Sequence, residues 1–93
     1  MKTSLDVTTR VTIAPSVYVR AFGEELVLLD FSRGEYFGLD ETGATIWRGL
    51  EAGRALGEIA DTLVEHYEVA RDVAYHDIVA LVTHMQSQSL LTF

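Results

Sequence analysis

The sequence predicts a small α+β domain in which a three-stranded antiparallel sheet is followed by three helices, a winged-helix-like arrangement. Up to residue 39, short runs rich in β-branched and aromatic residues alternate with glycine-containing turns. From residue 40 onward, the apolar spacing changes to the period of a helix. A chain of 93 residues supports one core, so the helices are expected to pack on one face of the sheet. We therefore treat residues 1–93 as a single domain.

Three strands are predicted in the first part of the chain, at residues 17–22, 26–31 and 35–39. Residues 23–24 and 32–34 form the turns between them, each with a glycine that accepts a positive φ at little cost. The second strand is apolar on both faces, so we place it in the middle of the sheet. The first ten or so residues show no period and are expected to form a loose arm, and the ordered core is expected at about 15–93.

Three helices are predicted after the sheet, at residues 41–52, 55–67 and 71–88. Asp40 is the expected N-cap of the first helix and Gly53 its end. Residues 90–93 are expected to be extended. The apolar stripes predict these core positions: Ala44, Ile46, Trp47 and Leu50; Leu56, Ile59, Ala60, Leu63, Val64 and Tyr67; Ala74, Ile78, Leu81, Val82 and Met85.

Composition excludes several classes of function. The net charge of −7 falls entirely on residues 35–93, where three arginines face ten carboxylates, so a nucleic-acid partner is not expected. The absence of cysteine excludes disulfides, thiolate catalysis and cysteine-based metal sites. The longest apolar run, residues 78–82, is far below the ~20 residues of a membrane span, and no signal segment opens the chain. We expect a soluble, cytoplasmic protein with no membrane partner.

The histidines do not form a catalytic or metal-binding pattern. His76 shares a helix face with Asp72, but no third ligand or nucleophile stands at a suitable spacing. We interpret His66, His76 and His84 as surface residues, and Trp47 as a core side chain rather than a platform for a ligand. No enzyme activity, cofactor or metal is therefore expected.

The third predicted strand is the unusual feature of the chain. It lies at an edge of the sheet, yet residues 35–39 carry one charge, at Glu35, and Gly38 leaves room for another backbone. Such an edge suits β-augmentation, in which an extended peptide pairs with the strand. The alternative is that the N-terminal arm or residues 90–93 cover this edge. The candidate strand residues are Glu35, Tyr36, Phe37, Gly38 and Leu39.

The third helix is the element long enough to form the opposite wall of a groove along this edge. Beside its core stripe it carries a mixed face with spacing i, i+4, i+7 and i+11, which suits a half-buried groove. A solvated boundary face is the alternative interpretation. The residues of this face are Val73, Asp77, Ala80 and His84.

Residues 28–47 read L-L-D-F-S-R-G-E-Y-F-G-L-D-E-T-G-A-T-I-W. They resemble the PqqD-like family, the peptide-recognition modules of pathways that modify ribosomally made peptides. The family pattern is roughly L-L-D-x-x-x-G-x-Y-[FY]-x-L-[ND]-x-x-[GA]-x-x-[IL]-W, and the resemblance extends over about residues 17–93. The chain departs from the family at Arg54-Ala55, where a Ser or Thr helix cap is usual.

The resemblance implies a non-catalytic adaptor that binds the leader segment of a precursor peptide as an added strand, between the third strand and the third helix. It adds Leu81 to the helix wall and implies that Asp77 accepts a leader N–H group or cation. Among subfamilies, the chain looks most like the small half of the split lasso-peptide maturation protease. That module serves a separate cysteine peptidase and an asparagine-synthetase-like cyclase. The alternatives are a PqqD-type chaperone for a radical-SAM enzyme in pyrroloquinoline quinone synthesis and, more remotely, a winged-helix DNA-binding protein.

Overall fold

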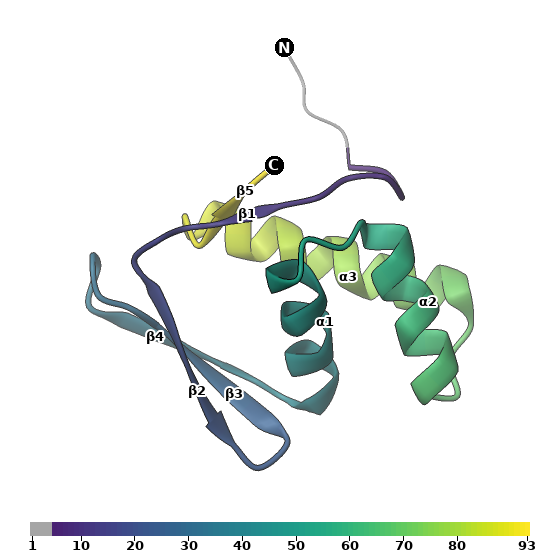
Figure 1. Ribbon diagram of the computed structural model, residues 1–93, viewed down its shortest axis with the longest axis horizontal. Helices are drawn as coiled ribbons and strands as arrows, with labels where there is room; N and C mark the ends of the chain where they lie inside the picture. The colour runs from purple at the N-terminus through teal and green to yellow at the C-terminus, as the bar shows by residue number, and fades with distance from the viewer. Residues whose placement is uncertain (1–4) are drawn as a thin grey trace.

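The computed structural model describes residues 5–93 and confirms the predicted fold class. A three-stranded antiparallel sheet precedes three helices, and a further pair of short strands joins residues 12–13 to residues 91–92 (Figure 1). The elements are β1 Thr12–Ile13, β2 Val17–Phe22, β3 Glu25–Asp30, β4 Glu35–Leu39, α1 Glu41–Glu51, α2 Leu56–His66, α3 Arg71–Ser87 and β5 Leu91–Thr92.

The sheet has the order β2-β3-β4, so β3 is central, as predicted. Phe31, just after β3, donates its N–H to the Ser16 carbonyl at 3.4 Å. In an antiparallel sheet the backbone groups of successive residues point alternately to either side. The odd-numbered residues of β3 therefore face β2 and the even-numbered ones face β4. Leu28 pairs with Phe37, so Phe37 bonds toward β3, whereas Tyr36 and Gly38 direct their N–H and C=O groups to the outer edge.

The two faces of the sheet differ in burial. Leu26 and Leu28 on one face are buried in the core, whereas Tyr18 and Tyr36 on the other are exposed. Phe31, predicted as the last residue of the second strand, lies instead in the turn. It is 67% exposed and packs edge-on against Tyr18 at 5.0 Å between ring centroids. The predicted strand, 26–31, therefore began and ended one residue late, and its end was misplaced because aromatic residues are typical of strands.

The helices form the core that the apolar stripes predict. Trp47 is fully buried, and Asp40 accepts the Gly43 N–H at 2.8 Å, which confirms the predicted N-cap. Three predicted core positions differ. Val64 is 40% exposed and Leu81 only half-buried, because each lies at the margin of its stripe rather than at its centre. Tyr67, just past the end of α2, is also half-buried.

Over residues 5–14 the N-terminal arm is not loose, so the expectation was wrong there, whereas residues 1–4 lie outside the described residues. Val11 is buried in the core, and the carbonyls of Thr9 and Val7 accept the N–H groups of Leu56 and Gly57, each at 2.9 Å. Ala55, at the start of α2, has no side-chain acceptor to offer. The backbone of the arm therefore replaces the Ser or Thr cap that the sequence lacks.

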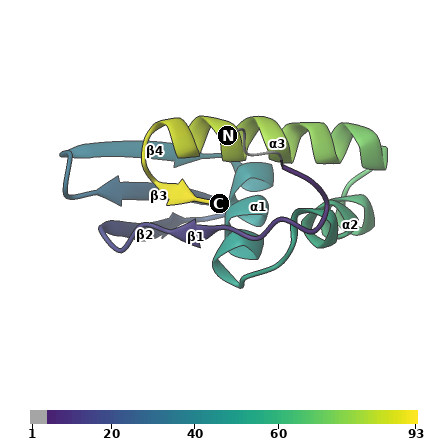
Figure 2. The same ribbon diagram turned by 90° about the horizontal axis from the view of Figure 1, so that it is seen from above.

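β1 and β5 pair with each other and leave the sheet edge open. Ile13 of β1 is opposite Leu91 of β5, and Ala14 donates its N–H to the Leu90 carbonyl at 2.9 Å. Within residues 5–93, no strand pairs with the outer edge of β4 (Figure 2). The alternative that the arm or tail covers this edge does not hold for the described residues.

Candidate functional site: a groove between β4 and α3

A cavity of about 120 Å³ lies between the end of β4 and the C-terminal half of α3. The two elements lie side by side in the view from above (Figure 2). Five predicted site residues line the cavity: Phe37, Gly38, Leu39, Leu81 and His84. Met85 and Leu90, which the sequence interpretation did not include in the site, complete its lining. The lining is mostly apolar and adjoins the outward-facing backbone of Gly38.

The end of α3 places Leu90 in this lining. Ser89 adopts a left-handed conformation with φ of 62°. Its N–H donates to the Gln86 carbonyl and the Leu90 N–H to the Met85 carbonyl, both at 3.0 Å. This is the Schellman pattern of helix termination, which brings the residue after the left-handed one against the last turn. Leu90 and Met85 therefore form a buried apolar floor.

The rim of the cavity is aromatic. The ring of Phe37 meets the imidazole of His84 edge-on, with centroids 6.5 Å apart and an interplanar angle of 81°. Phe37 is half-buried and His84 is exposed. A ligand side chain that enters the cavity would therefore pass beside two rings, and aromatic edges and faces favour apolar contacts.

The opposite end of the groove is polar. A hollow of about 300 Å³ there is bordered by residues 34–37 and Gln88. Arg33 forms an ion pair with Glu35 at 3.5 Å and donates from Nη1 to the Gln88 carbonyl at 3.0 Å. The guanidinium of Arg33 thus ties the β3–β4 turn to the end of α3. The groove is apolar near Leu39 and charged near Glu35.

Asp30 fixes the turn that leads into β4. Its Oδ1 accepts the Ser32 hydroxyl at 2.7 Å, the Ser32 N–H at 3.1 Å and the Ser16 hydroxyl at 3.2 Å. The side chain is buried, yet its pKa lies below the ordinary value of 3.8, because the hydrogen bonds from Ser32 and Ser16, with the charge of Arg33, outweigh desolvation. The ionised carboxylate thus connects the β3–β4 turn at Ser32 to Ser16, the residue before β2.

Comparison with known proteins identifies the family. The sequence profile described as "Coenzyme PQQ synthesis protein D (PqqD)" matches residues 25–91. The chain belongs to the PqqD family. Among curated protein sequences, none matches it.

Two solved structures resemble this PqqD-family chain. One is described as "TbiB1 in Complex with the TbiA(beta) Leader Peptide", with a TM-score of 0.82 and 34% identity over 86% of this chain and 93% of that one. The other is "Lasso peptide synthetase B1 complexed with the leader peptide", with a TM-score of 0.84 and 33% identity over 91% of this chain and 100% of that one. Both relatives were solved with a leader peptide bound.

The remaining predicted residues of α3 do not line the cavity. Val73, Asp77 and Ala80 are exposed and lie toward the N-terminal end of the helix, on the same face as His84. The helix rises about 1.5 Å per residue, so this face extends roughly 16 Å from His84 to Val73. Met85 and Gln88 were missed as site residues. They lie four and seven residues after Leu81 and so share its helix face, and this spacing could have predicted them as site residues.

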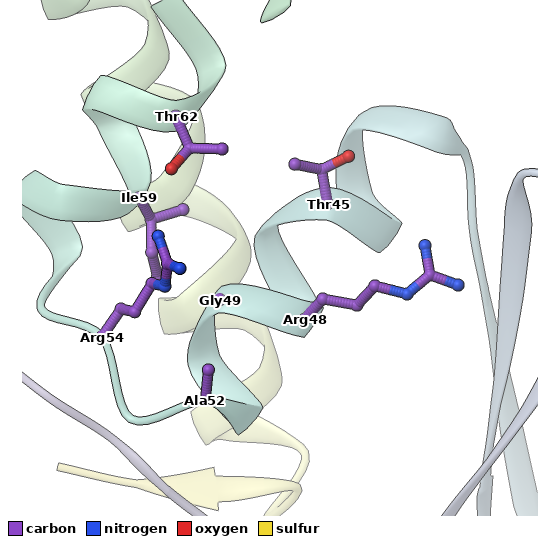
Figure 3. Close-up of a pocket in the computed structure, with 7 residues that line it drawn as sticks. All are labelled: Thr45, Arg48, Gly49, Ala52, Arg54, Ile59 and Thr62. Atoms are coloured by element: carbon purple, nitrogen blue, oxygen red, sulfur yellow. The ribbon is translucent and has the colours of Figure 1, made fainter. Parts of the chain in front are cut away.

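A larger hollow of about 250 Å³ between α1 and α2 lacks the features of a binding site. The hydroxyls of Thr45 and Thr62 donate to carbonyls of their own helices. The side chains of Arg48 and Arg54 do not converge, since Arg48 extends away from the rest of the lining (Figure 3). Residues 5–93 hold no cluster of three or more metal-ligating side chains, and none of their helices has the length and apolarity to span a membrane.

Proposed function

We propose that this chain is a leader-binding adaptor of lasso-peptide biosynthesis. It binds the leader segment of a ribosomally synthesised precursor as an additional strand on β4. The observation that carries the proposal is the open outer edge of β4 beside an apolar cavity. Two relatives of about one-third identity, both described as bound to a leader peptide, support it.

The outer edge of β4 supplies the backbone contacts. Tyr36 and Gly38 offer N–H and C=O groups that point away from β3, and an extended peptide pairs with groups at this spacing. A Cβ at Gly38 would meet no atom within 4 Å, so packing inside the described chain does not require glycine there. The missing side chain suits the close approach of a second backbone.

The cavity supplies the side-chain contacts. Alternate residues of a bound strand point to one face, so one leader side chain would enter the space among Phe37, Leu81 and Met85. Each edge hydrogen bond contributes about 1 kcal/mol and each buried anchor about 2 kcal/mol. Pairing along the edge and the side-chain anchor therefore both contribute to leader affinity, and they act against the entropic cost of association.

The exposed face of α3 would guide the leader beyond the end of β4. Val73, Asp77 and Ala80 lie where a strand that continues past Leu39 along α3 would run. Asp77 forms no ion pair within the described chain. We assign its carboxylate the role of acceptor for a leader N–H group or cation, and Val73 and Ala80 the role of apolar contacts.

The adaptor would then present the bound precursor to a separate cysteine peptidase and to a cyclase, without catalysis of its own. The description of the family profile favours a second candidate, a chaperone for a radical-SAM enzyme of pyrroloquinoline quinone synthesis. A DNA-binding role has less support. Arg71 is the single Lys or Arg of α3, and its Nε forms an ion pair with Asp61 at 2.8 Å. Binding to a phosphate backbone requires several free cations on one face.

Fluorescence anisotropy tests leader binding directly. The probe is a labelled synthetic leader of the precursor peptide encoded beside this chain, with the TbiA(beta) leader as a reference. We expect saturable binding in the micromolar range or tighter, and cleavage of the precursor by the adjacent cysteine peptidase only when this chain is added. Absence of binding to its own leader contradicts the proposal, and cleavage at an equal rate without the chain contradicts the adaptor role.

A further inference from the structure

The sheet has a second open edge, along β2. Residues 18, 20 and 22 face β3, so the backbone groups of Val17, Val19 and Ala21 point outward. The Val17 N–H is already satisfied, since it donates to the Ala14 carbonyl at 3.2 Å. Val19 and Ala21 keep both of their groups free of backbone partners within residues 5–93, and Val17 keeps its carbonyl.

This edge lacks the usual protection against strand pairing. Natural edge strands carry lysines, prolines or bulges, whereas β2 has Arg20 as its only charge and exposed aromatic rings at Tyr18 and Phe22. No helix flanks it as α3 flanks β4, and the two edges lie on opposite sides of the sheet (Figure 2). An isolated peptide would find backbone partners here, but neither the β4–α3 cavity nor the α1–α2 hollow borders β2.

We propose that β2 pairs antiparallel with β2 of a second copy of this chain, with the two-fold axis at Val19. Antiparallel pairing of identical strands is self-complementary, as a two-fold interface requires. Val19 would exchange two hydrogen bonds with Val19 of the second copy. The N–H of Ala21 would donate to the free Val17 carbonyl across the axis.

The side chains favour this register over its neighbours. With the axis at Val19, the guanidinium of Arg20 lies opposite the ring of Tyr18 in the second copy, a cation–π arrangement made twice. A shift of two residues in the pairing in one direction places Arg20 opposite Arg20, which is repulsive. A shift in the other direction places Pro15, which has no N–H, opposite Ala21.

The dimer would join two sheets into one, with β4 of each copy at the two ends. Both β4 edges and both grooves beside α3 remain open, so the pairing is independent of leader binding. The two sites can therefore be tested separately in one protein.

Sedimentation velocity of the full chain tests the pairing over about 10 µM to 1 mM. We expect the apparent mass to rise from 10.3 kDa toward twice that value. Val19→Pro should stay monomeric, because it removes the N–H at the axis while leaving the β2–β3 hydrogen bonds intact. Circular dichroism and an unchanged affinity for the labelled leader would show that this variant is folded. A wild-type chain that remains monomeric at 1 mM, or a Val19→Pro chain that still dimerises, overturns the proposal.

Disulfide trapping tests the register. The chain has no cysteine, so single thiols can be placed at will. Residues 18 and 20 would be opposite each other in a non-hydrogen-bonded pair, with Cα atoms about 4.5 Å apart, which suits a disulfide. A mixture of the Tyr18→Cys and Arg20→Cys variants should form the mixed dimer at least fivefold in excess of either homodimer. Val64→Cys, exposed on α2, is the control. A statistical mixture, or equal trapping of the control, contradicts the register.

Discussion

The two edges of the sheet present the same kind of backbone groups but different surroundings. β4 lies beside α3 and an apolar cavity, whereas within residues 5–93 no helix flanks β2 in the same way and the β4–α3 cavity does not reach it (Figure 2). Hydrogen bonds to an edge strand do not distinguish one peptide sequence from another, so selectivity must come from pockets for side chains. We therefore propose that leader recognition belongs to β4 and self-pairing to β2.

The largest effect is expected from Gly38→Pro on β4. It removes an edge N–H and places a ring where the leader backbone would approach, so leader affinity should fall about 100-fold or more. Folding should survive because the Gly38 N–H does not bond to β3. Anisotropy with the labelled leader measures the affinity, and circular dichroism checks the fold.

Two matched variants sharpen this prediction. Val19→Pro makes the same change on the other edge and should leave leader affinity within twofold of the wild-type value. Phe37→Pro removes an N–H that faces β3, so it should destabilise the hairpin itself. Equal loss of leader binding in folded Gly38→Pro and Val19→Pro would show that the two edges are not distinct.

Leu81→Glu tests the cavity beside β4. It places a charge against the apolar lining at a half-buried position, so leader affinity should fall about 30-fold, while stability changes by about 1 kcal/mol or less. Val64→Glu introduces the same side chain at an exposed apolar position on α2 and should have no effect on affinity. Isothermal titration calorimetry measures both. If Leu81→Glu binds as the wild-type chain does, the cavity is not the anchor site.

A smaller effect is expected at Asp77, outside the cavity. Asp77→Lys should weaken leader binding about two- to fivefold, since an exposed ion pair or charged hydrogen bond contributes at most about 1 kcal/mol. Glu65→Lys is the control because it changes the net charge equally on α2. Asp61 is a poorer control, since its carboxylate is paired with Arg71. If Asp77→Lys and Glu65→Lys weaken leader binding equally, the effect comes from the overall charge of the chain rather than from the exposed face of α3.

The smallest effect is a pH dependence from Asp30. Its pKa in the folded chain lies below the ordinary value of 3.8, so its contribution to stability is complete above that value and is lost as pH falls through the lowered pKa. The free energy of unfolding in urea should therefore fall more between pH 7 and pH 3 for the wild-type chain than for Asp30→Asn. Asp6, whose pKa is also lowered, mainly by hydrogen bonds from Thr8, is common to both chains. Parallel pH profiles would contradict this role of Asp30.

The sequence predicted most of the fold because its signals are local. The strand and helix periods, the turn glycines and the Asp40 cap each act within a few residues. The N-terminal arm was misjudged because its role depends on distant residues. The carbonyls of the arm accept hydrogen bonds from the first N–H groups of α2. No periodic pattern in residues 5–14 predicts such a hydrogen bond to Leu56.

The site was predictable in part for the same reason. The low charge of residues 35–39 pointed to an open edge, and the structure leaves that edge unpaired among the described residues. The cavity lining depends on how the chain turns after α3, where Ser89 rather than glycine adopts the left-handed conformation. Leu90 therefore lines the cavity because of a turn that the local sequence, which lacks a glycine there, does not predict.

Amide hydrogen exchange of β4, followed by NMR with and without the labelled leader, tests the central claim most directly. The N–H of Phe37 should exchange slowly in both states, because it bonds to β3. The N–H groups of Tyr36 and Gly38 should exchange rapidly in the free chain and at least tenfold more slowly when the leader is bound. Unchanged exchange at Tyr36 and Gly38 under saturating leader would contradict strand addition on β4.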